Sequence, residues 1–150
     1  MYLDFELFAS PDKQLQSSDL AGKGGRGIFI VYEADSSEQA QLDYLEKILA
    51  AAKIDMEQDV NILAVPPDGS IQLNPTAFSS TPQYILLFGV KPKQLGLNYQ
   101  LPTYHPVTYQ GATYLWVDSL ATIQEERLAG KNQKAGALWL ALKQIFLPSS

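Results

Sequence analysis

The sequence of 150 residues contains no cysteine and a single histidine, His105. The absence of cysteine excludes disulfide bonds, thiolate nucleophiles, zinc–thiolate sites and cysteine-ligated iron–sulfur clusters. His105 stands before a proline in a tyrosine-rich loop, and a metal or catalytic role would require partners within its reach. We therefore expect neither a metal ion nor a cofactor, and interpret His105 as a surface or packing residue.

Long apolar runs and excess basic charge are also missing. No window approaches the roughly 18 apolar residues of a membrane span, and the N-terminus lacks the basic and apolar regions of a signal peptide. We expect a soluble cytoplasmic protein that does not bind membranes. Lysine and arginine number 11 against 16 acidic residues, a net charge of -5. Because nonspecific nucleic-acid binding needs a basic face, this balance argues against direct nucleic-acid binding.

What is present fits one globular domain. Hydrophobic residues make up 46% of the sequence, enough for a substantial core at this length. We expect residues 27–150 to form a single α/β domain after an N-terminal strand or flexible segment over residues 1–26. The glycine cluster at residues 21–27 precedes a strand instead of following one, so we interpret it as a connector or turn and not as a phosphate-binding loop.

Apolar strands alternate with helical patterns along this domain. Apolar runs predict three strands, at residues 28–32, 60–65 and 84–88, and the unbroken run at 28–32 is typical of a strand buried on both faces. Apolar residues at helical spacing predict a helix from about residue 37 to residue 53 and a C-terminal helix over residues 135–146. An edge hairpin is predicted across Gln110 and Gly111. The alternation predicts a three-layer α/β/α fold with a mostly parallel central sheet of about four to five strands.

Polar side chains follow the predicted strands where parallel strands place their carboxyl ends together. The candidate catalytic residues are Glu33, Asp35 and Asp118, and the residues expected in the binding crevice are Lys91, Ser119 and Trp116. Grouped carboxylates can activate water, with a lysine stabilising negative charge. Alternatively, Asp35, Asp118 and Ser119 cap the helices that follow them, which is the commoner role of Asp and Ser before a helix.

Three short motifs stand in the C-terminal part of the chain. They are Gly111-Ala112, Asp118-Ser119-Leu120 and the Lys-Ala-Gly-Ala-Leu-Trp run from Lys134 to Trp139. In this order they resemble the C-terminal part of the bacterial DNA polymerase III psi subunit, where a strand leads to a helical turn and then to a basic entry into an Ala-Leu-Trp helix. The helix and strand between Tyr44 and Leu63 are compatible with that family as well.

The order of elements is also similar to the uracil-DNA glycosylase fold, to which psi is structurally akin. Those enzymes carry a Gly-Glu-Ala-Pro-Gly type of motif after the first strand and His-Pro-Ser after the last. This chain keeps Glu33 and Ala34 of the first motif and has Asp118 and Ser119 at the second, without the histidine. The resemblance covers roughly residues 27–147 and implies a glycosylase-like fold without glycosylase catalysis.

Two functions follow from these observations. The resemblance implies a non-enzymatic protein–protein interaction module that binds a replisome subunit such as the clamp loader, and such a module is expected to expose an apolar patch. The alternative is a divergent DNA-base enzyme that uses Glu33, Asp35 or Asp118 to position water. That enzyme would require a pocket for a flipped base and an aromatic side chain to stack on it.

Overall fold

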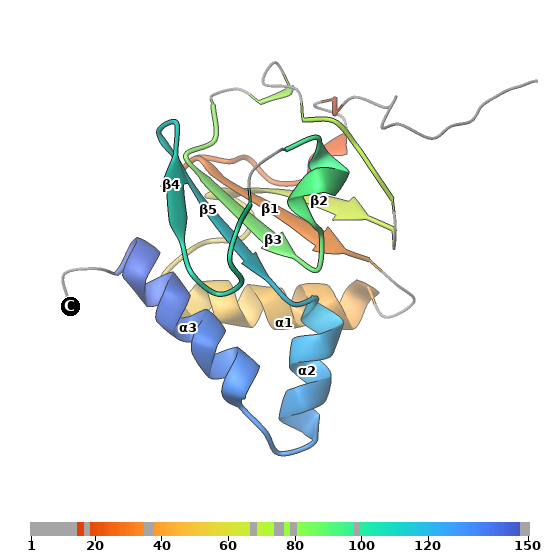
Figure 1. The fold of residues 1–150 in the computed structure, drawn as a ribbon, viewed down its shortest axis with the longest axis vertical. Helices are drawn as coiled ribbons and strands as arrows, with labels where there is room; N and C mark the ends of the chain where they lie inside the picture. Colours follow the sequence, from red (N-terminus) through yellow and green to blue (C-terminus); the bar gives the residue numbers. More distant parts are fainter. Residues whose placement is uncertain are drawn as a thin grey trace, which may run out of the picture.

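The computed structural model describes residues 15–16, 19–34, 38–66, 69–73, 77–78, 81–97 and 100–147. The elements in these ranges are β1 (Ile28–Glu33), α1 (Glu38–Ala51), β2 (Val60–Val65), β3 (Tyr84–Phe88), the 3₁₀-helix η3 (Pro92–Leu95), β4 (Val107–Tyr109), β5 (Ala112–Val117), α2 (Leu120–Leu128) and α3 (Gln133–Phe146) (Figure 1). Each strand predicted from the apolar runs is present at its expected place.

The strands form one sheet in the order β2-β1-β3-β5-β4. The first four are parallel, and β4 pairs antiparallel with β5, so that Thr108 stands opposite Thr113. This arrangement confirms the predicted α/β class and the mostly parallel sheet of about four to five strands, and it is consistent with the predicted three-layer α/β/α fold. The similarity to uracil-DNA glycosylases stays a prediction.

Alternating side chains of β1 enter two separate cores, as the two-residue period of a strand requires. Ile30 and Tyr32 pack with α1, α2 and α3, whereas Phe29 and Val31 pack on the opposite face. All four side chains are at most 2% exposed. Because both faces of the strand are buried, its sequence is an unbroken apolar run without alternation.

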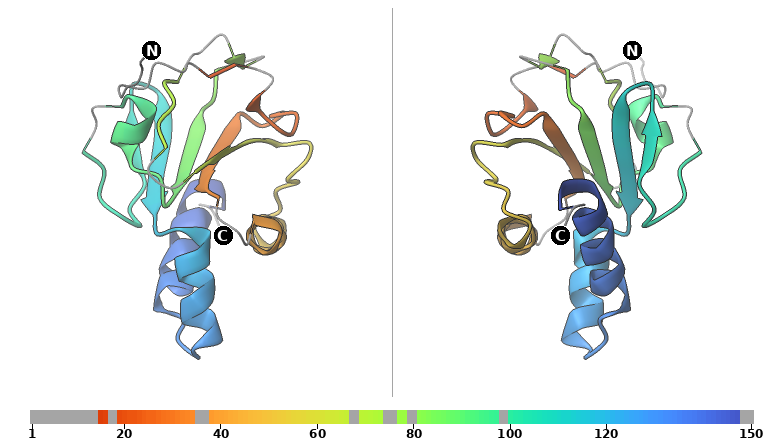
Figure 2. Two further views of the ribbon diagram at one scale, coloured as in Figure 1. Left: turned by 90° about the vertical axis from the view of Figure 1, so that its right-hand side faces the viewer. Right: turned by 90° about the vertical axis from the view of Figure 1, so that its left-hand side faces the viewer.

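The three α-helices lie on one side of the sheet (Figure 2). Helix α1 connects β1 to β2 on this side of the sheet. The next connection runs in the opposite direction along the sheet, from β2 past β1 to β3. Because crossovers between parallel strands are right-handed, this second connection passes over the other face. That face is covered by η3 and by irregular segments, through the buried residues Leu15, Ile71, Ala77, Val90, Leu95 and Leu101. The second outer layer is therefore largely irregular in the described residues.

The described part of the N-terminal segment packs against β2. Leu15 is fully buried, and Ala21 forms an antiparallel bridge with Ile62. Gly22 has a φ of +84°, and a Cβ atom there would lie 2.2 Å from the backbone oxygen of Val60. Glycine at this position therefore permits a close approach of two backbones.

Helices α2 and α3 form a hairpin that extends away from the sheet, with α1 beside its base (Figures 1 and 2). The predicted C-terminal helix is confirmed as α3, while the sequence did not delimit α2 as a separate helix. Ser119 caps the start of α2, and Gly130 ends it with a φ of +84°. The Glu126 side chain accepts a 2.7 Å hydrogen bond from the Lys134 backbone N–H and so caps the start of α3. No helix of the described chain is long and apolar enough to cross a membrane.

One polar side chain is buried in the helical core without a partner. Gln41 of α1 is 1% exposed, and within the described part of the chain neither its Nε2 nor its Oε1 has a hydrogen-bond partner. A buried, unpaired polar group costs about 1–3 kcal/mol of stability. Gln41 therefore destabilises the helical layer relative to an apolar side chain of the same shape.

We expect Gln41→Met to raise the free energy of unfolding by about 1–3 kcal/mol, because it removes both unpaired groups and keeps the side-chain length. Urea denaturation at unchanged m-value measures the gain. Gln39→Met is the matched control, since Gln39 is exposed on the same helix and bonds Asp43; its effect should stay within about 0.5 kcal/mol. A Gln41→Met variant that is less stable than wild type would contradict this account.

Candidate functional site

A hollow of about 260 Å³ opens at the carboxyl ends of β1, β3 and β5. We call it the strand-end hollow, and its lining residues are Glu33, Gly89, Lys91, Thr103, Trp116, Val117, Asp118 and Ser119. Five residues singled out from the sequence, Glu33, Lys91, Trp116, Asp118 and Ser119, thus line one hollow. The sixth, Asp35, lies outside the described residues. Topology places the hollow where open α/β sheets usually bind ligands.

Gly89 brings the ends of β3 and β5 close together. Its φ is +77°, and a Cβ atom there would lie 2.6 Å from the Cβ of Ser119 and 2.8 Å from its Cα. The Gly89 N–H also donates a 3.0 Å hydrogen bond to the Val117 carbonyl. Only glycine fits this contact without a shift of the backbone, so Gly89 fixes the floor of the strand-end hollow.

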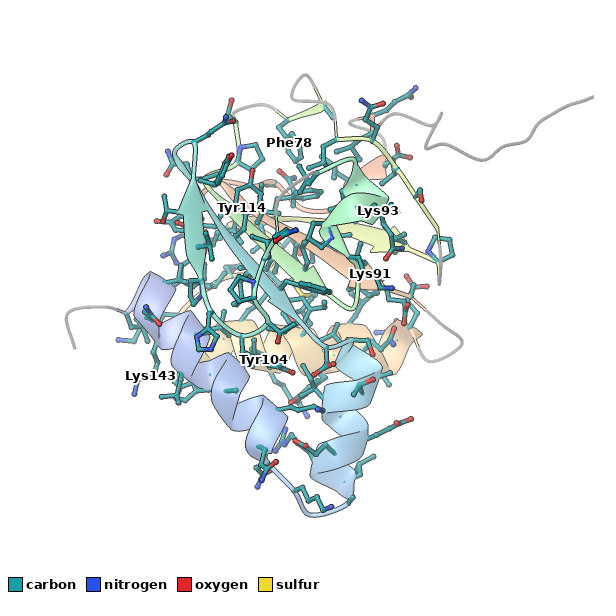
Figure 3. All side chains as sticks on the ribbon, viewed as in Figure 1. Phe78, Lys91, Lys93, Tyr104, Tyr114 and Lys143 are labelled. Carbon is teal, nitrogen blue, oxygen red and sulfur yellow. The ribbon has the colours of Figure 1, made fainter. Side chains whose placement is uncertain are left out.

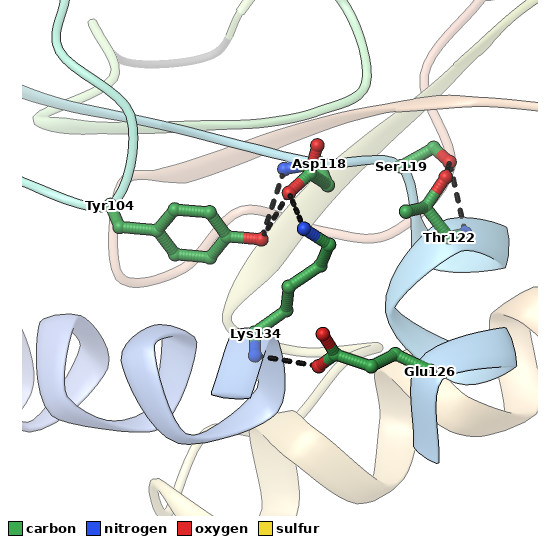
Figure 4. Close-up of polar contacts among 6 residues, drawn as sticks. All are labelled: Tyr104, Asp118, Ser119, Thr122, Glu126 and Lys134. Atoms are coloured by element: carbon green, nitrogen blue, oxygen red, sulfur yellow. Dashed lines mark hydrogen bonds and ion pairs between the residues drawn. The ribbon is translucent and has the colours of Figure 1, made fainter. Parts of the chain in front are cut away.

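Asp118 is held by two side chains from distant parts of the chain (Figure 4). The Tyr104 hydroxyl donates a 2.7 Å hydrogen bond to Asp118 Oδ2, and Lys134 Nζ lies 3.5 Å from the same oxygen. Tyr104 comes from the loop before β4, and Lys134 from the first turn of α3. Oδ2 is thus already engaged by the protein, which leaves Oδ1 for any water or ligand.

Tyr104 stands in the left-handed region with a φ of +64°, a conformation that costs energy in a residue with a side chain. Burial, and then the hydrogen bond to Asp118, raise the pKa of its hydroxyl well above the ordinary value of 10.0. Tyr104 therefore stays a protonated donor across the physiological range. It lies at the border between the sheet and the helical layer (Figure 3).

Ser119 has the capping role. Its Oγ accepts a 3.1 Å hydrogen bond from the Thr122 N–H and donates one of 2.9 Å to Thr122 Oγ1 (Figure 4). This is the N-cap of α2, as the capping interpretation predicted for Ser119. Asp118 does not cap the helix in this way, because its carboxylate turns to Tyr104 and Lys134.

Glu33 ends β1 and Lys91 follows β3, so both come from the same side of β5 in the sheet order, and both line the strand-end hollow. Lys91 is exposed and stands next to Lys93, which belongs to η3 (Figure 3). Among the described residues, no group of three or more His, Asp or Glu side chains could hold a metal ion. The chemistry available at this hollow is thus that of one half-buried glutamate, one lysine and the engaged Asp118.

Sequence reasoning missed the partners of Asp118. Tyr104 lies 14 residues before Asp118, in a tyrosine-rich loop that gave no signal for this contact. Lys134 was noticed as part of a basic helix start, and the opposite charges of the two residues were the available hint. Glu126 was not singled out, although an acidic residue near a helix N-terminus is favourable.

Two neighbouring hollows of about 550 and 230 Å³ lie between α1 and the α2–α3 hairpin. Tyr44, Lys47 and Arg127 line both of them. We call the combined feature the helical groove. Leu128, at the rim of the larger part, is 84% exposed, which makes it an unusually open apolar side chain.

Comparison with protein-family models and with characterised proteins finds no match for this chain. The strand-end hollow and the helical groove, with the residues that line them, are therefore the features that point to a function. The strand-end hollow is where an enzyme would act, and the helical groove is where a partner could dock.

We expect Gly89→Ala to destabilise the protein by clearly more than Gly111→Ala. Both glycines have positive φ, +77° and +85°, but a Cβ at Gly111 meets nothing within 4 Å. The strain from φ alone costs about 1 kcal/mol, so any excess at Gly89 measures the clash with Ser119. Urea unfolding of both variants gives the comparison, and equal losses would show that the close contact with Ser119 carries no energetic weight.

Tyr104→Phe should lower the free energy of unfolding by about 1 kcal/mol, since it deletes the hydrogen bond to Asp118. The raised pKa of Tyr104 makes this contribution complete below about pH 10 and lost as pH rises towards the folded-state pKa. The difference in the free energy of unfolding between wild type and variant should therefore shrink above that pH.

Lys134→Met, which removes an exposed ion pair, should lower the free energy of unfolding by about 0.5 kcal/mol or less. A larger loss in Lys134→Met than in Tyr104→Phe would contradict the expectation that the hydrogen bond from Tyr104 contributes more than the ion pair.

Proposed function

We propose that this chain is a non-enzymatic protein-binding module of the psi type, a cytoplasmic accessory protein that joins a replication partner such as the clamp loader. The observation that carries the proposal is the helical groove, which offers apolar and cationic side chains to solvent. One of its walls is built by α2 and α3. These helices belong to residues 111–146, the same stretch that resembles the psi subunit.

The state of Asp118 favours binding over catalysis. An aspartate that positions water needs a carboxylate oxygen that faces the substrate, and only Oδ1 is left for this, because Oδ2 is bound to Tyr104 and lies beside Lys134. Its neighbour Ser119 is engaged as a helix cap. The polar groups at the end of β5 are therefore explained by their structural contacts.

The alternative of a DNA-base enzyme keeps one observation in its favour. Glu33 and Trp116 line the same hollow, which pairs a carboxylate with an aromatic side chain. A flipped base would need to stack on Trp116 while Glu33 positions water. This arrangement would also require a negatively charged DNA backbone to approach a protein with a net charge of -5.

The binding function is tested with the purified clamp-loader subunits of the same organism. We expect the full-length protein to form a stoichiometric complex with one of them, detected by size-exclusion chromatography with light scattering and by calorimetry. The absence of any complex with the complete set of subunits would overturn the proposed function.

The enzymatic alternative is tested by incubating the protein with single- and double-stranded DNA that contains uracil. We expect no excision by wild type or by Asp118→Asn. Excision by wild type that is lost in Glu33→Gln, with unchanged folding by circular dichroism, would replace the binding proposal with the enzymatic one.

A further inference from the structure

The helical groove has the length of a short helix. On the α1 side its lining residues are Ala40, Asp43, Tyr44, Lys47, Ile48 and Ala51. They recur every three to four residues and form one stripe along α1. From Ala40 to Ala51 this stripe covers about 17 Å, or three helical turns. A partner helix of similar length fits along it.

The centre of the groove is cationic. Lys47 and Arg127 line both parts of the groove, whereas Asp43 lines only the larger part. The Arg127 guanidinium lies 5.5 Å from the centre of the Tyr44 ring. Within the described residues the ion pairs are Arg26–Asp59 and Lys134–Asp118, so no described carboxylate pairs with Lys47 or Arg127. In a chain of net charge -5, these two side chains make the centre of the groove locally positive.

The smaller part of the groove is apolar. Its lining contains Ile48 and Ala51 from α1 and Ala135, Leu138 and Trp139 from α3. Trp139 is half-buried and packs against the helical core. A large aromatic side chain at the wall of such a groove is a typical anchor point for a partner's apolar residues.

We infer that the helical groove binds a short amphipathic helix of an acidic partner protein, with apolar residues against Trp139 and a carboxylate between Lys47 and Arg127. This inference rests on the proposed protein-binding function and names the surface and the chemistry of its partner. An amphipathic helix laid in a hydrophobic groove is an established recognition mode. A groove walled by helices presents no free strand edge, so a partner strand has nothing to pair with.

The two tryptophans of the chain allow a direct measurement. Trp116 lies at the strand-end hollow, so Trp116→Phe leaves Trp139 as the reporter of the groove. The probe is a helical peptide of about four turns with leucines on one face and glutamates beside them. We expect a saturable change in Trp139 emission with this peptide and little change with the same peptide carrying lysine in place of glutamate.

Charge variants locate the binding. Lys47→Glu in the Trp116→Phe background should weaken the acidic peptide by about tenfold or more, because it replaces attraction at the groove centre by repulsion. Lys23→Glu is the matched control: it makes the same change of net charge at an exposed residue of the N-terminal segment, and should leave the affinity unchanged. Circular dichroism of each variant checks that the fold is retained.

Three outcomes overturn the inference: no saturable response to the acidic peptide, equal binding of the acidic and basic peptides, or equal losses in Lys47→Glu and Lys23→Glu. A concentration-dependent dimer that Lys47→Glu dissociates would also overturn it, since the occupant would then be a second copy. Clamp-loader binding that survives Lys47→Glu rejects this surface but keeps the proposed function. Peptide binding without any clamp-loader complex rejects the replication partner and keeps the groove.

Discussion

The need to bury a parallel sheet on both faces determines most of this structure. Residues Ile85 to Phe88 of β3 are all buried, and neighbouring side chains enter opposite cores. Parallel strands are stable only when both faces are covered. The α-helices of the described chain cover one face, so the other must be covered by η3 and by proline- and glycine-containing connections. Irregular segments therefore contribute to this core, as residues 100–106 do through the buried side chain of Leu101. The same segment carries Tyr104, which forms a hydrogen bond with Asp118.

Local sequence patterns were sufficient to predict those elements whose own residues carry a clear apolar period. The buried strands β1, β2 and β3 appear as apolar runs, α1 and α3 as helical stripes, and the β4–β5 hairpin as a turn at Gln110 and Gly111. Helix α2 was not delimited, because its buried residues are Leu120 and Ile123 while Leu128 is left to solvent. A helix with so few core contacts has a weak periodic pattern.

The grouping of the candidate residues at one hollow followed from topology, since parallel strands bring their carboxyl ends to the same edge. The role of Asp118 could not follow from it. That role depends on a tyrosine in a left-handed conformation and on a lysine at the start of another helix, and both are placed by tertiary packing. Residue type at a strand end thus predicted the position of the carboxylate, whereas the direction in which it points depends on contacts remote in sequence.

Asp118 and the helical groove are connected through the hairpin. Lys134 of α3 lies beside Asp118, and its backbone N–H is capped by Glu126 of α2, so the start of α3 is fixed to both β5 and α2. Leu138 and Leu142 then anchor α3 in the core. For the proposed partner helix, walls that are already ordered would lower the conformational entropy lost on binding. The contacts of Lys134 with Asp118 and Glu126 thus position the start of α3, the helix that carries Trp139 in the wall of the groove.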